Sequence, residues 1–146
     1  MNELDKPNLL IVDDRKENLL VLETILKGLD INIIKANSGE EALWKVMQHE
    51  FFLVILDIQM PGMDGFETAN YIRLRVKNKD IPIIFITAGD TTLDKKINFS
   101  LKACEANAVD YLTKPIDPTA LVGKVNKFLK IYKLTKPSHD GTKGQW

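Results

Sequence analysis

The stretch Phe52-Leu53-Val54-Ile55-Leu56-Asp57 is a run of five apolar residues that ends in an acid. A strand with one solvated face alternates apolar and polar residues, whereas a continuous apolar run is typical of a strand covered on both faces. Leu9–Val12 and Ile83–Ile86 have the same character, and Ile31–Lys35 and Val109–Leu112 are weaker strand candidates. The sequence therefore predicts a sheet that is buried on both sides.

Helical patterns lie between these apolar runs. Apolar residues repeat at spacings of three and four in two series, Leu19, Leu22, Ile25, Leu26 and Leu29, and Ala42, Leu43, Val46 and Met47. Residue types that cap helices precede three of the helical segments, namely Ser38 with Glu41, Asp64, and Asp117 before Pro118. Strands joined by helical crossovers are parallel, so five strand–helix repeats predict an α/β sandwich with helices on both faces.

Length and composition indicate one globular domain. The 146 residues are 45% hydrophobic, which suffices for a core, and the single cysteine, Cys104, allows no intramolecular disulfide. Twenty basic and twenty acidic residues cancel, so no overall positive charge favours nucleic acid or anionic lipid. The apolar runs are far shorter than the roughly 18 residues that span a bilayer. We expect a cytoplasmic domain over residues 7–133 and a polar tail or linker over residues 134–146.

Chemically distinctive residues follow the predicted strands. Asp13 and Asp14 come after the first strand, Asp57 ends the third, Thr87 ends the fourth, and Lys114 follows the fifth. Sites in open parallel sheets lie beyond the carboxyl ends of the strands, where these side chains would meet. Each residue taken alone is also compatible with an ordinary loop or cap position.

The combination of these residues predicts phosphoryl chemistry. Three neighbouring carboxylates raise one another's pKa unless a cation lies among them, and a cluster with only oxygen ligands suits Mg²⁺. Asp57 could then attack phosphorus to give an acyl phosphate. Lys114 and the metal would offset charge on the phosphoryl oxygens while the Thr87 hydroxyl donates to one of them.

Four motifs resemble the receiver domain of bacterial two-component response regulators. They are Ile11-Val12-Asp13-Asp14, Leu56-Asp57-Ile58-Gln59-Met60-Pro61-Gly62-Met63-Asp64-Gly65, Thr87-Ala88 and Tyr111-Leu112-Thr113-Lys114-Pro115. The resemblance covers about residues 7–133. It implies a flavodoxin-like (βα)5 sandwich with a five-stranded parallel sheet in the order 2-1-3-4-5.

The resemblance also assigns roles at the site. Asp57 would accept phosphoryl from the phosphohistidine of a histidine kinase or a histidine phosphotransfer protein. Asp14, Asp57 and the Gln59 backbone carbonyl would bind Mg²⁺ directly, and Asp13 would bind it through water. Lys114 would assist the transfer, and the Lys114–Pro115 bond would be cis.

The signalling role is likewise implied by the family. Thr87 and Tyr111 would be the switch pair, with the hydroxyl moving towards the phosphoryl group and the ring turning inward. This would change the face formed by the fourth helix, the fifth strand and the fifth helix. The expected binding partners of this face are a downstream protein, an attached output domain or a second phosphorylated copy. No direct contact to nucleic acid is expected. The chain itself would be either a single-domain regulator or a receiver from a longer protein, such as a hybrid histidine kinase.

Two departures and two rate-setting positions stand out against the family pattern. The segment from Thr87 to Lys114 is longer than usual, and Asn107 stands where glycine is common. Gln59 and Gly89 occupy positions that influence the dephosphorylation rate in the family.

Three alternatives remain at this stage. An aspartyl-phosphate phosphatase of the haloacid-dehalogenase type needs a second aspartate where this chain has Gln59. A flavin module would place a flavin phosphate beside Asp13 and Asp14, which would repel it. A receiver-shaped scaffold that needs no phosphorylation would not require every charged position to be filled, as it is here. We therefore expect a phosphoacceptor that turns over no external substrate.

Overall fold

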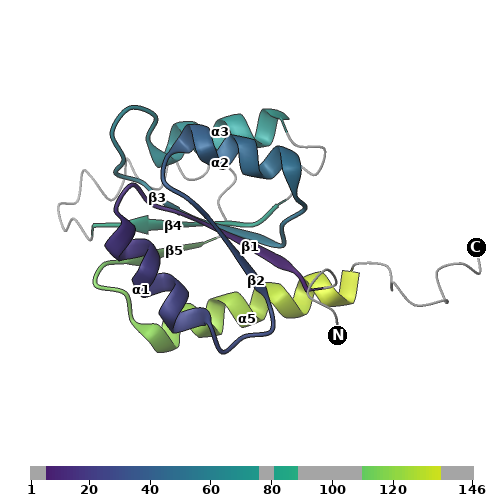
Figure 1. Ribbon diagram of the computed structural model, residues 1–146. Coiled ribbons are helices and arrows are strands. Elements are labelled where there is room, and N and C mark those ends of the chain that lie inside the picture. The colour runs from purple at the N-terminus through teal and green to yellow at the C-terminus, as the bar shows by residue number, and fades with distance from the viewer. Residues whose placement is uncertain (1–5, 76–80, 89–109, 136–146) are drawn as a thin grey trace, which may run out of the picture.

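Five parallel strands form a single sheet in the order β2-β1-β3-β4-β5 (Figure 1). The structure is a computed structural model, and it describes residues 6–75, 81–88 and 110–135. The order confirms the predicted topology. The strands are β1 (Asn8–Val12), β2 (Asn32–Ala36), β3 (Leu53–Asp57), β4 (Ile83–Thr87) and β5 (Asp110–Thr113).

Helices cover both faces of this sheet. In Figure 1, α1 (Lys16–Leu26) and α5 (Pro118–Thr135) lie on one side, and α2 (Gly39–Gln48) and α3 (Gly65–Arg75) lie on the other. The arrangement is the predicted α/β sandwich. The expected fourth helix, together with Cys104 and Asn107, falls outside the described residues. Among the helices that the structure describes, none combines the length and apolar content needed to cross a bilayer.

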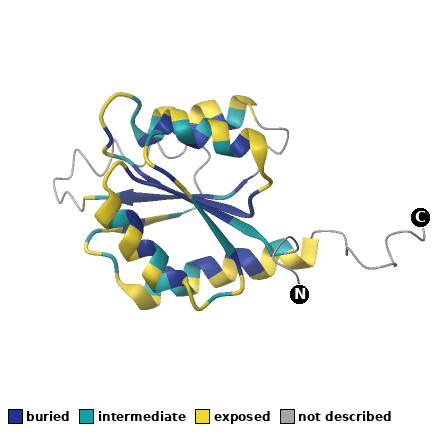
Figure 2. Cartoon of the chain, viewed as in Figure 1, coloured by how far each residue is buried: buried dark blue, intermediate teal, exposed yellow. Residues whose placement is uncertain are grey.

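The core forms two layers, one on each side of the sheet. Leu9, Ile11 and Ile55 pack towards α1 and α5, while Leu10 and Val12 belong to the layer under α2 and α3. Figure 2 shows the strands at the centre of the sheet buried along their length. Successive strand residues point to opposite faces, so where both faces are covered, adjacent residues of a central strand are all apolar. This is the physical origin of the continuous apolar runs.

The predicted helix caps form, and they fix where the helices begin. The Ser38 Oγ accepts from the Glu41 backbone N–H at 3.0 Å. At α3, Asp64 and Glu67 bond reciprocally, with the Glu67 N–H donating to Asp64 Oδ1 at 2.9 Å and the Asp64 N–H donating to Glu67 Oε1 at 3.3 Å. Asp117 Oδ1 accepts from the Thr119 N–H at 3.1 Å, just before α5. Each cap satisfies an N–H that the first helical turn leaves without an intrahelical partner.

The structure corrects two details of the helical predictions. Met47 is 62% exposed rather than part of a stripe facing the sheet. The buried residues of α2 are Gly39, Ala42 and Val46, and Met47 lies about 100° further round the helix than Val46. Leu29 is partly buried but lies beyond the end of α1 at Leu26.

Candidate functional site

The ends of four strands bring the predicted polar residues to one edge of the sheet. Asp13 follows β1, Asp57 is the last residue of β3, and Lys114 follows β5. Thr87 ends β4 and pairs with Thr113, while Asp57 pairs with Ile86. The strand order places β1 and β4 on either side of β3, so Asp57 lies at the centre of this edge.

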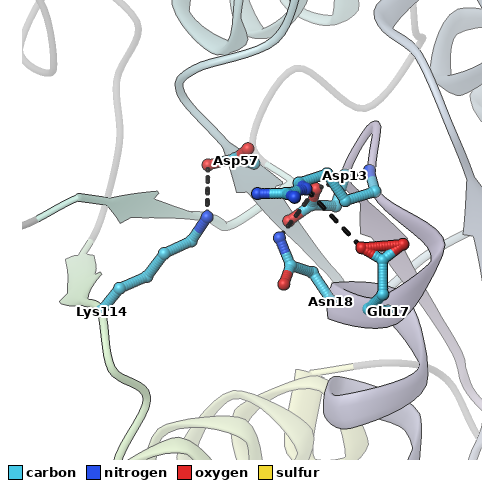
Figure 3. A network of polar contacts seen from close by, with 6 residues as sticks. Asp13, Glu17, Asn18, Asp57 and Lys114 are labelled. Atoms are coloured by element: carbon cyan, nitrogen blue, oxygen red, sulfur yellow. Dashed lines mark hydrogen bonds and ion pairs between the residues drawn. The ribbon is translucent and has the colours of Figure 1, made fainter.

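Three carboxylates and one ammonium form the site, which we call the acidic site: Asp13, Asp14, Asp57 and Lys114. Each of the three aspartates offers an oxygen, and these oxygens lie within 4.8 Å of one another. Asp13 and Asp57 are 1% and 3% exposed, respectively. Lys114 Nζ lies 3.6 Å from Asp57 Oδ1 (Figure 3). One ammonium does not neutralise three carboxylates, so the negative charge of the site would favour the binding of a cation.

Burial changes the protonation of the two inner acids. Burial and the neighbouring Asp13 carboxylate raise the pKa of Asp57 to about 6, although Lys114 acts in the opposite direction. Burial also raises the pKa of Asp13, against the lowering effects of its hydrogen bonds and of Lys114. In the absence of a cation, the site therefore takes up protons more readily than exposed aspartates do.

Asp13 has one satisfied and one unsatisfied oxygen. Its Oδ1 accepts from the Arg15 backbone N–H at 2.9 Å and from Asn18 Nδ2 at 3.3 Å (Figure 3). Its Oδ2 is buried and is the one side-chain polar atom in the described residues that is buried without a hydrogen-bond partner. Buried polar atoms are normally satisfied, so an orphaned carboxylate oxygen beside two other acids fits a hard cation such as Mg²⁺ or its bound water. Sequence reasoning missed Asn18, for which the signal is an amide in the first turn after the acidic pair.

The loop after β3 holds Asp57 in place. The Ile58 N–H donates to the Ile86 carbonyl at 3.0 Å, and the Gly65 N–H donates to the Ile58 carbonyl at 2.9 Å. A Cβ at Gly65 would collide with the Asp57 carbonyl oxygen and would lie 2.7 Å from Ile58 Cα. The start of α3 therefore packs directly on the backbone that carries Asp57. Gln59 follows within the same loop, and its backbone N–H lowers the pKa of Asp57 by hydrogen bonding.

The remaining predicted residues lie on β4, β5 and the turn after β5. The Lys114 N–H donates to the Thr87 carbonyl at 2.9 Å, which ties the two strand ends together. The Lys114–Pro115 bond is cis. Tyr111 pairs in register with Phe85 and is 53% exposed, so it stands on the outer strand with its side chain largely in solvent.

The fold and the acidic site define a flavodoxin-like α/β domain with three clustered carboxylates that could hold a cation, and comparison with known proteins gives its family. The sequence model described as "Response regulator receiver domain" matches residues 9–126. The chain belongs to this family, as the resemblance implied, and it is a receiver domain of two-component signalling. That family is a signalling domain rather than a classical enzyme.

Relatives and solved structures agree with the assignment. The chain is 38% identical over 123 residues to "Probable transcriptional regulator ycf27" of Cyanidium caldarium, covering 84% of this chain and 46% of the relative. It is 35% identical over 128 residues to "Transcriptional regulatory protein YvrH" of Bacillus subtilis, covering 87% and 51%. It thus spans about half the length of these two curated relatives. A putative response regulator from Chloroflexus aurantiacus superimposes with a TM-score of 0.75 at 36% identity, covering 86% of this chain and 99% of that one.

Proposed function

We propose that Asp57 is the phosphoacceptor of a two-component phosphorelay, taking its phosphoryl group from the phosphohistidine of a histidine kinase or a histidine phosphotransfer protein. The observation that carries the proposal is the placement of Asp57 between an acidic pair and the Lys114 ammonium, 3.6 Å away, at the end of the central strand. The family membership supports the same role. We also propose that the protein is cytoplasmic, as expected from its sequence.

The chemistry follows from the residues in the acidic site. An Asp57 oxygen attacks phosphorus, the phosphorus–nitrogen bond to the donor imidazole breaks, and its electron pair leaves with the imidazole. Asp57 must be ionised to attack, and a pKa of about 6 leaves most of it ionised near neutral pH. Lys114 offsets charge on the transferring group, and the Thr87 hydroxyl donates to one of its oxygens.

The Mg²⁺ site of the proposal uses oxygen ligands only. Asp14, Asp57 and the Gln59 backbone carbonyl would hold the ion directly, and Asp13 would hold it through water. Mg²⁺, when bound, supplies positive charge beside the phosphoryl oxygens. The unsatisfied Asp13 Oδ2 and the mutual proximity of the three carboxylates support this assignment.

Phosphorylation would change the surface around β5, the edge strand on the opposite side of the sheet from β2. The Thr87 hydroxyl would move towards the new phosphoryl group, and the Tyr111 ring would turn inward from its exposed position. This would alter the face formed by the fourth helix, β5 and α5, of which the fourth helix lies outside the described residues. We propose that this face contacts a downstream protein, an attached output domain or a second phosphorylated copy. The two curated relatives are about twice as long as the matched region, which leaves length for such a domain in those proteins.

A direct test uses acetyl phosphate and intact-mass measurement. The wild-type protein with Mg²⁺ should gain the mass of one phosphoryl group, and Asp57→Asn should gain none. Asp64→Asn is the matched control, because Asp64 caps α3 in the loop after Asp57 and asparagine caps a helix equally well. The proposal is wrong if the wild-type protein gains no phosphoryl group, or if Asp57→Asn gains one.

The dephosphorylation rate offers a second measurement. Exchanging Gln59 or Gly89 should change the lifetime of the adduct, as the family positions imply, and Gly89 lies outside the described residues. The decay is followed by mass after removal of the phosphodonor. An unchanged decay in both exchanges would reject this part of the proposal.

A further inference from the structure

We infer that Asn18 is a positioning residue for the Mg²⁺ site, acting through Asp13. Asn18 lies in the first turn of α1, and its side-chain amide donates to Asp13 Oδ1 at 3.3 Å. The inference rests on the proposed function, because it concerns the same cation. It goes further by assigning a role to a residue that is neither an acid nor a member of the four motifs.

Two donors hold a single oxygen of Asp13. The Arg15 backbone N–H donates to Oδ1 at 2.9 Å. The Asn18 side-chain amide, in the first turn of α1, donates to the same atom at 3.3 Å (Figure 3). With Oδ1 occupied twice, Oδ2 is the oxygen left for a cation or its water, and it is buried without a partner. A carboxylate held by one donor can rotate about its Cβ–Cγ bond, since that torsion is broad and two-fold. The second donor restricts this rotation.

The chemistry of the amide suits this task. A lysine or arginine at residue 18 could also donate to Asp13, but its positive charge would compete with Mg²⁺ for the carboxylates. A neutral amide orients the carboxylate and leaves the negative charge of the site available. Asn18 also lines a cavity of about 260 Å³ beside Asp13 and Lys114, so its side chain lies at the edge of the acidic site.

A purely structural role for Asn18 makes a different prediction. If Asn18 only stabilised the start of α1, its replacement would change the free energy of unfolding but leave the Mg²⁺ dissociation constant unchanged. Alanine has a better helix propensity than asparagine, which opposes the loss of the hydrogen bond in the folded helix. The affinity for Mg²⁺ therefore separates the two roles better than stability does.

The experiment is calorimetric titration of the phosphate-free protein with MgCl₂. Asn18→Ala should raise the dissociation constant about 10-fold, since ligand-orienting partners contribute on this scale. Asn18→Gln keeps an amide donor and should recover part of the affinity. Leu20→Ala is the matched control on the same helix, because Leu20 is exposed and neutral. The affinity of this variant for Mg²⁺ should equal that of wild type. Circular dichroism checks that each variant is folded.

The outcomes separate this inference from the proposed function. If wild type binds Mg²⁺ and is phosphorylated on Asp57 while Asn18→Ala binds Mg²⁺ equally well, the role of Asn18 is wrong and the phosphoacceptor stands. If wild type neither binds Mg²⁺ nor accepts phosphoryl on Asp57, the proposed function itself is wrong. Should Asn18→Ala fail to fold, Asn18→Leu removes the donor with a similar side-chain shape, and unchanged affinity in that variant would equally overturn the inference.

Discussion

The Asp57 carboxylate is held where its charged form is disfavoured. Its pKa rises from an ordinary value of 3.8 to about 6, chiefly through burial and then through Asp13. Between these two values the folded protein binds a proton that the unfolded chain has released. Stability without a cation therefore falls as pH rises through this interval and levels off above about pH 6. Asp57 must be ionised to act as the proposed phosphoacceptor, so the proposed function requires the charged form that burial disfavours.

Removing the Asp57 charge should accordingly stabilise the cation-free protein. At pH 7.5 in EDTA, we expect Asp57→Asn to raise the free energy of unfolding by about 2–3 kcal/mol, because the pKa of Asp57 rises from 3.8 to about 6 on folding. At pH 3.5 both proteins carry an uncharged group at residue 57 in the folded state, so the gain should largely vanish. Urea denaturation at the two pH values measures both quantities. An equal gain at pH 3.5 would assign the effect to packing rather than to charge.

Lys114 opposes the effect of burial on the pKa of Asp57. Its ammonium lowers the pKa of Asp57, so Lys114→Gln should raise that pKa above about 6. We also expect phosphorylation by acetyl phosphate to slow about 100-fold, because a preorganised positive group would be lost. Carboxyl-carbon NMR titration without Mg²⁺ gives the pKa. Lys124→Gln is the control, since Lys124 pairs with Asp110 at 2.6 Å instead, and its Asp57 pKa should stay unchanged.

At the scale of the elements, β3 and α3 form one unit through a close contact at Gly65. A Cβ there would collide with the Asp57 carbonyl oxygen, whereas a Cβ at Gly123, on the exposed side of α5, meets nothing within 4 Å. Gly65→Ala should therefore destabilise the protein by about 1–3 kcal/mol and slow phosphorylation by displacing Asp57. Gly123→Ala should stabilise it by about 1 kcal/mol through helix propensity. Thermal unfolding compares the two, and a stabilising Gly65→Ala would contradict this packing.

The sequence predicts elements well where one physical factor dominates. Central strands are buried on both faces, so apolar runs locate β1, β3 and β4 to within a residue, and side-chain caps locate the starts of α2 and α3. Met47 shows the limit, because an exposed methionine beside a buried valine is indistinguishable in sequence from a wider apolar stripe. An amide in the first turn after the acidic pair indicates Asn18 as a candidate, but its contact with Asp13 depends on a side-chain conformation that the sequence alone does not determine.

At the scale of the whole molecule, the acidic site exists only because the strands are ordered as they are. Residue types and strand ends predict its members, but their meeting point depends on β1 and β4 flanking β3. Local patterns do not determine that order, and it came from the family resemblance. Because Asp13, Asp57 and Lys114 lie at the ends of three different strands, the site is lost when the sheet unfolds. Binding of the proposed Mg²⁺ would therefore be thermodynamically linked to global stability.

This linkage makes a final prediction about Mg²⁺ and pH together. At pH 7.5, Mg²⁺ at ten times its dissociation constant should raise the free energy of unfolding by about 1.4 kcal/mol, because it binds only the folded chain. At pH 4.5 a group with a pKa of about 6 is mostly protonated, and protonated Asp57 cannot serve as a ligand, so the gain should shrink strongly. Thermal unfolding with MgCl₂, against NaCl of equal ionic strength, measures both. Asp57→Asn should show a reduced Mg²⁺ effect at pH 7.5, and equal effects at both pH values in wild type would place the cation elsewhere on the protein.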